Sequence, residues 1–140
     1  MDKKLLEFLN DYINKIERLA KEADEITHIK SVSELGNRYY VFKEELKDAY
    51  EDVNRSESKR RKLEKKDPSK VHTLRSRCVG SVYMTLLESS AHKMPQKNSK
   101  DIGAISNICY VVRMDLTDGL PYLKKHRDAL LKENAESLEE

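Results

Sequence analysis

The sequence predicts an all-α protein, folded as an up-and-down antiparallel bundle of four to five helices. Apolar residues recur at alternating spacings of three and four positions over long stretches, which places them on one face of a helix. The chain of 140 residues holds only four Gly and three Pro, too few for the many tight turns of a β-sandwich or barrel. Hydrophobic residues make up 38% and charged residues 37%, so the core has to be built from narrow helical stripes.

Two long helices are expected in the first half of the chain. The first spans about residues 2–29, and its apolar face consists of Leu5, Leu9, Tyr12, Ile16, Leu19, Ala23 and Ile26. Ser31 stands three residues before Glu34, an arrangement typical of a capping box, so a second helix is expected over residues 32–66. Its apolar face consists of Val32, Leu35, Tyr39, Phe42, Leu46, Ala49 and Val53. Short connections between long helices favour antiparallel neighbours.

A third helix is expected after Asp67. Pro68 cannot continue the second helix, but Asp67 can cap a new one that has Pro68 at its first position. This helix is expected to end near Met94-Pro95, and Gly80 within it indicates a close approach to a neighbouring helix. Its apolar face consists of Val71, Leu74, Cys78, Val82 and Leu86.

The last part of the chain predicts a helix that is kinked or broken. Ser99 or Asp101 can cap a helix that begins at residue 102, and residues 118–121 (Asp-Gly-Leu-Pro) break or kink it near Pro121. The acidic residues 133–140 are expected to fray as a tail, which leaves residues 1–132 as one domain.

Charge is distributed unevenly, although the net charge is only +2. Residues 55–77 carry ten basic and three acidic side chains, a balance of +7, whereas the other 117 residues have a balance of −5. We call residues 55–77 the basic tip, because the second helix turns into the third there. Its basic residues are Arg55, Lys59, Arg60, Arg61, Lys62, Lys65, Lys66, Lys70, Arg75 and Arg77.

The basic tip predicts binding to the phosphate backbone of DNA or RNA without sequence preference. Arg55, Lys59, Lys62 and Lys66 recur at spacings of four, three and four, so they line one stripe of a helix. The same charges also suit an acidic protein or a membrane surface, or they form only a solvated face. Base stacking gains no support, because the chain has no Trp and the nearest aromatic residue, Tyr50, precedes the tip.

No catalytic residue, metal ligand or cofactor is predicted. The histidines are His28, His72, His92 and His126, and none has a His or Cys three or four residues away. Cys78 and Cys109 stand among apolar residues and are expected to be buried thiols. His28, followed by Lys30 and Ser31, loosely resembles the pattern of histidine phosphotransfer domains, although the Lys is one residue too close. Such a module or a small helical enzyme stays an alternative.

Apolar residues outside the main stripes favour a homodimer. Tyr40, Val41 and Tyr50 widen the apolar face of the second helix and are predicted to lie in the dimer interface. Further flanking positions are Leu6, Ile13, Tyr83, Val111 and Leu131. A two-fold axis would bury many of them in a self-complementary contact.

The function expected from these patterns is that of a non-enzymatic subunit or adaptor whose basic tip binds nucleic acid. The alternative from another class is a protein-only adaptor or inhibitor that acts through self-association and partner docking. No apolar segment is long enough to cross a membrane, and residues 1–7 do not resemble a secretion signal. Only two Cys are present, so a cytoplasmic, reducing location is expected.

Overall fold

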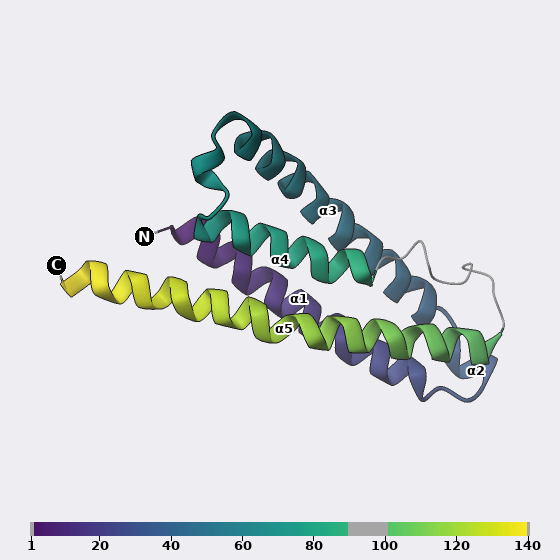
Figure 1. Cartoon of the computed structure of the whole chain (residues 1–140). Helices are drawn as coiled ribbons and strands as arrows, with labels where there is room; N and C mark the ends of the chain where they lie inside the picture. Colours follow the sequence, from purple (N-terminus) through teal and green to yellow (C-terminus); the bar gives the residue numbers. More distant parts are fainter. Residues whose placement is uncertain (1, 90–100, 140) are drawn as a thin grey trace.

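The fold is an all-α bundle, which confirms the predicted class (Figure 1). The computed structural model describes residues 2–89 and 101–139, and no strand occurs among them. Its elements are α1 (Lys3–Thr27), α2 (Val32–Leu35), α3 (Arg38–Lys66), the 3-10 turn η1 (Pro68–Lys70), α4 (Leu74–Glu88) and α5 (Ile102–Glu139). The long helices alternate in direction along the chain, as short connections require.

The α1 and α5 helices form a pair, and α4 packs against this pair. Figure 1 shows α1 and α5 running antiparallel side by side, and these two share the largest helix-to-helix interface. The α4 helix packs between α5 and α3, and α3 crosses the bundle obliquely. As a result, the C-terminal half of α3 and the turn η1 project from the rest of the molecule at the end where the chain starts.

The predicted apolar stripes form most of the core, but Val71, expected on the stripe of the third helix, is 41% exposed and lies before α4. Every residue of the expected α1 stripe is buried, and Asp2 caps the helix by accepting a hydrogen bond from the Leu5 N–H at 2.9 Å. Leu46 of α3 is also buried, as its mid-stripe position predicts, and Ile105 of α5 is buried as well. Ile13 and Tyr83 correct the prediction, because both are buried although the sequence pattern puts them on flanking positions.

The helix expected over residues 32–66 is interrupted after one turn. Ser31 accepts a hydrogen bond from the Glu34 N–H at 3.2 Å, so its role as a cap is confirmed. Gly36 then adopts φ of +45°, a conformation that other residues rarely accept, and it ends α2. The prediction of one continuous helix is therefore wrong, and Val32 is 44% exposed instead of lying in the core.

The start of the third helix also differs from the prediction. Asp67 caps only the short turn η1, where it accepts a hydrogen bond from the Ser69 N–H at 3.2 Å. The α4 helix begins at Leu74 and is capped by the Thr73 hydroxyl oxygen, which accepts from the Ser76 N–H at 3.3 Å. The expected end near Met94-Pro95 and the alternative cap Ser99 lie outside the described residues.

The α5 helix is continuous through Pro121, so of the predicted kink or break the break is absent. Asp101 caps it, with the Ala104 N–H donating to the carboxylate at 3.0 Å. Proline removes one backbone hydrogen bond from a helix, but Pro121 is exposed, so water can reach the carbonyl that it leaves unpaired. Buried Leu116 and Leu123 hold the helix to the core on both sides, and the helix extends to Glu139, through the segment expected to fray.

The close approach between helices occurs at Gly119 of α5. A Cβ atom on Gly119 would lie 2.4 Å from both Oγ1 and Cγ2 of Thr85 on α4. Gly80, which the sequence pattern singles out, is less constrained, because its nearest neighbour is the Arg60 guanidinium carbon at 3.7 Å. The residue that sets the spacing of α4 and α5 is therefore Gly119.

Candidate nucleic-acid interface

The basic tip is the projecting end of the α3, η1 and α4 hairpin (Figure 1). Only one side of α3 faces the bundle here, and Val53 and Glu57 are its last buried residues. Beyond Glu57, α3 is in contact with solvent on most of its circumference. The tip is therefore held by few apolar contacts and depends on polar ones.

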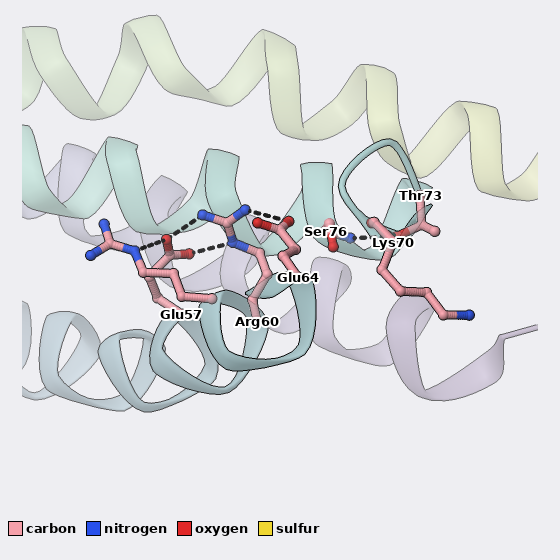
Figure 2. A network of polar contacts seen from close by, with 7 residues as sticks. Glu57, Arg60, Glu64, Lys70, Thr73 and Ser76 are labelled. Atoms are coloured by element: carbon pink, nitrogen blue, oxygen red, sulfur yellow. Dashed lines mark hydrogen bonds and ion pairs between the residues drawn. The ribbon is translucent and has the colours of Figure 1, made fainter. Parts of the chain in front are cut away.

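A network of charged side chains takes the place of an apolar core in the tip (Figure 2). Glu57 is buried, and its carboxylate accepts hydrogen bonds from Arg60 Nε at 2.8 Å and from Arg61 Nε at 2.9 Å. Arg60 also donates through Nη2 to Glu57 and through Nη1 to Glu64 at 2.7 Å. These residues come from successive turns of α3, so the network stiffens the projecting half of the helix.

The electrostatics of the network keep Glu57 ionised. Burial alone would raise the pKa of the Glu57 carboxyl, but the hydrogen bonds from Arg60 and Arg61 and their positive charges outweigh it. The net result is a pKa below the usual value. A carboxylate in this state requires at least one arginine to remain beside it.

Two of the ten predicted phosphate ligands therefore have a structural role. The Arg60 side chain is largely buried and packs against Gly80, and its donors are directed to Glu57 and Glu64. The Arg61 guanidinium lies 5.6 Å from the centre of the Tyr83 ring while it also holds Glu57. The sequence pattern assigns both arginines to nucleic acid. It does not show that their partner Glu57 is buried, because that burial depends on tertiary packing.

Two further arginines of the tip form exposed ion pairs. Arg55 contacts Asp52 at 3.0 Å, and Arg75 contacts Asp2 at the start of α1 at 3.2 Å. Exposed pairs of this kind contribute about 0 to 1 kcal/mol, so a phosphate can compete for these guanidinium groups.

The remaining six basic residues of the tip are exposed cations. Within residues 2–89 and 101–133, whose side chains the structure describes, none of them forms an ion pair with a carboxylate. They are Lys59, Lys62, Lys65, Lys66, Lys70 and Arg77. Figure 2 shows the Lys70 ammonium pointing away from the network, while the Lys70 carbonyl accepts a hydrogen bond from the Thr73 hydroxyl at 2.8 Å.

A pocket of about 390 Å³ opens beside these cations, where the N-terminus of α1 meets α3 and α4. Lys4, Lys59 and Arg75 bring positive charge to it. Its apolar lining comes from Leu5, Phe8, Leu63 and Val79, and its hydroxyls from Ser56 and Ser76. Sequence reasoning missed Lys4 and Phe8, because no local pattern links α1 to a segment so far along the chain.

Comparisons with protein-family models, curated proteins and solved structures returned no match.

The two cysteines are unreactive. Both are buried, and burial raises the pKa of the Cys78 thiol to about 11 and that of Cys109 to about 12. Reactive cysteines need the opposite shift, because the thiolate is the nucleophile. The part of the chain that the structure describes contains no group of three or more His, Cys, Asp or Glu residues arranged for a metal ion.

The histidines lie in unrelated places. His28 caps the C-terminus of α1 on the surface, and its ring Nδ1 lies 2.7 Å from the Asp24 carbonyl oxygen. His72 is exposed in the turn before α4, and His92 lies outside the described residues. His126 of α5 lies 3.0 Å from the Ser81 hydroxyl of α4, in a second cleft of about 590 Å³ that sequence reasoning did not foresee.

The environment of His126 favours its neutral form. Burial lowers the pKa of His126, and the charges of Arg77 and Lys125 lower it further. Ser81 and His126 both lie inside helices, where backbone N–H groups bond to the preceding turn. Their side chains link α4 to α5 across the cleft.

The structure places the predicted dimer residues in different environments. Val41 is 48% exposed, whereas Tyr40 is half-buried. Tyr50 is also half-buried and stacks on Tyr83, with 6.0 Å between the ring centres. Among the described residues, no helix has the length and apolarity needed to span a membrane.

Proposed function

We propose that this chain is a non-enzymatic interaction protein whose basic tip binds the phosphate backbone of nucleic acid. The observation that carries the proposal is the separation of roles among the cations of the tip. Arg60 and Arg61 are held by Glu57, and they stiffen the hairpin on which the six exposed cations stand. A rigid support lowers the entropic cost of binding, because the cations are already gathered on one projecting element.

The mode of binding follows from the kind of contact available. Lysine ammonium groups on an exposed helix neutralise phosphates and release counterions, which gives affinity without reading bases. The acidic remainder of the chain, with its balance of −5, would orient the molecule with the tip toward a polyanion.

The test replaces Lys62, Lys65 and Lys66 with Ala and measures binding to duplex DNA and to RNA across a range of salt concentrations. We expect weaker binding for every sequence tried, and a salt slope reduced by about 0.9 for each duplex phosphate that the variant no longer neutralises. These lysines are exposed and support no buried group, so the variant should keep the thermal stability of the wild-type protein.

A matched control distinguishes an effect of the tip from a general effect of lost positive charge. Changing Lys21, Lys47 and Lys125 to Ala removes the same three charges from positions outside the tip. The proposal requires this control to bind nearly as well as the wild-type protein. Equal losses of affinity in both variants, or no binding by wild-type protein at micromolar concentration and low salt, would show that the tip is only a solvated face.

We also propose that the chain forms a homodimer, because apolar side chains remain exposed outside the tip. Val41 of α3 and Tyr110, Val111, Met114 and Tyr122 of α5 are each more than 40% exposed. Partners of a protein-only adaptor would use the same surfaces, and two basic tips in one assembly would increase avidity for an extended polyanion.

Light scattering tests the dimer. We expect a mass near twice the 16.3 kDa of one chain, and a shift to the monomer when Tyr40 and Val41 are both changed to Lys. Val111→Lys is the matched comparison, because Val111 and Val41 are equally exposed, at 48%. Dissociation by Val111→Lys alone would move the interface to α5. A wild-type mass near that of one chain over a hundredfold concentration range would rule the dimer out.

A further inference from the structure

The pocket between α1, α3 and α4 combines cations with apolar side chains. A charged face that meets only water does not require this combination. Lys4 and Lys59 lie beside it without an ion pair to any described carboxylate, and Arg75 lies there with only the exposed pair to Asp2. The lining also contains four apolar side chains, Leu5, Phe8, Leu63 and Val79, together with the hydroxyls of Ser56 and Ser76. A volume of about 390 Å³ falls within the range of pockets that hold small molecules or parts of larger ligands.

Leu63 is the apolar residue that stands out in the basic tip. It lies between Lys62 and Glu64 on α3, is 46% exposed, and contributes its side chain to the pocket. Leu63 therefore places an accessible apolar side chain beside Lys59 at the edge of the pocket.

Phe8 provides the aromatic surface that the tip lacks in the sequence. It is half-buried, packs against the core, and lines the pocket. Its ring packs against the Tyr12 ring, with 4.8 Å between the ring centres. An aromatic ring fixed in this way is a stacking platform that loses little entropy on binding.

We propose that this pocket receives one unpaired base of the nucleic acid whose phosphates lie on Lys4, Lys59 and Arg75. The inference rests on the proposed function of the tip and adds a substrate class to it. Bases of a duplex are stacked and paired inside the double helix, so they do not reach a pocket between helices. Single strands and loops present free bases, which bind by stacking on aromatic side chains. The tip therefore prefers single-stranded nucleic acid to duplex.

The experiment compares binding of one single-stranded oligonucleotide and of the duplex with the same sequence, at the same salt concentration. The wild-type protein is expected to bind the single strand more tightly. Phe8→Ala should weaken single-strand binding roughly 5- to 150-fold, the range for removal of one base-stacking ring. Its effect on duplex binding should be small, because the phosphate contacts remain.

Two further variants keep the test independent of folding. Leu63→Gln changes a side chain that is half exposed, so it should preserve the fold and still reduce single-strand preference. Met84→Gln makes the same kind of change at an apolar side chain that is 50% exposed on α4, outside this pocket, and should leave the preference unchanged.

The possible outcomes distinguish the base pocket from the phosphate-binding tip on which it rests. Equal affinity for single strand and duplex, unchanged by Phe8→Ala and Leu63→Gln, would overturn the base pocket and leave the phosphate-binding tip intact. Absence of binding to both nucleic acids would overturn the proposed function together with the pocket.

Discussion

Changing Arg60 to Met is expected to destabilise the folded protein by about 3 kcal/mol, the cost of removing one partner from a buried ion pair. Glu57 is buried, with only 3% of its side chain exposed, and Arg60 contributes two of the three hydrogen bonds that it accepts. Arg61 alone would remain beside the carboxylate, and its own side chain is 65% exposed. Urea or thermal unfolding measures the change in stability.

The double variant Glu57→Leu with Arg60→Met is the control for this prediction. Replacing a buried pair by apolar residues of similar size is often neutral, so the double variant should regain most of the lost stability. Arg55→Met breaks an exposed pair, with 74% of the arginine side chain accessible, and should change stability by less than about 1 kcal/mol. Equal effects of Arg55→Met and Arg60→Met would contradict the structural role given to Arg60.

The pH dependence of stability provides a second measurement on the same network. Because the pKa of Glu57 is lower in the folded state, its contribution is complete above the unfolded value near 4.3. The contribution is lost as the pH falls through the folded pKa. The wild-type protein should therefore lose stability relative to the Glu57→Leu, Arg60→Met variant as the pH falls below about 4.

Gly119→Ala is expected to destabilise the protein by about 2 kcal/mol, against the ordinary preference of helices for alanine. The new methyl group would stand 2.4 Å from two side-chain atoms of Thr85 and 2.9 Å from its Cβ. Thr85 is buried and donates a hydrogen bond from Oγ1 to the Ser81 carbonyl at 2.8 Å, so it cannot turn away without losing that bond. The helices α4 and α5 would have to separate. Thermal unfolding measures the effect.

Gly80→Ala is the matched control, because Gly80 also lies inside a helix but its added Cβ would meet only Arg60, at 3.7 Å. Alanine there should be neutral or stabilising by up to about 1 kcal/mol. Adding Thr85→Ala to Gly119→Ala removes two of the three nearest atoms and should restore part of the stability. If Gly119→Ala is as stable as Gly80→Ala, the close packing of α4 against α5 at this point is wrong.

Features that depend on neighbouring residues could be predicted from the sequence. The stripe of α1 and the caps Asp2 and Ser31 are local, since a helix brings residues three and four positions apart onto one face. The same reasoning failed at Gly36, and at Pro121 it did not decide between a kink and a break. One glycine with positive φ ended a helix, and one exposed proline was tolerated inside another.

The candidate site required the tertiary structure. Local charge identified the basic tip, but not which of its cations face solvent. Because Glu57 is buried, Arg60 and Arg61 stabilise the fold by pairing with it. The packing of α1 places Phe8 and Lys4 beside the tip.

The sequence by itself therefore determined the helical class, the main apolar stripes and the place of the positive charge, because each follows from residue type and spacing along one helix. Only the tertiary structure decided which charges neutralise one another, which glycine allows two helices to meet, and which distant residues share a pocket. Those features depend on the packing of one helix against another, and a pattern within a single helix does not contain that information.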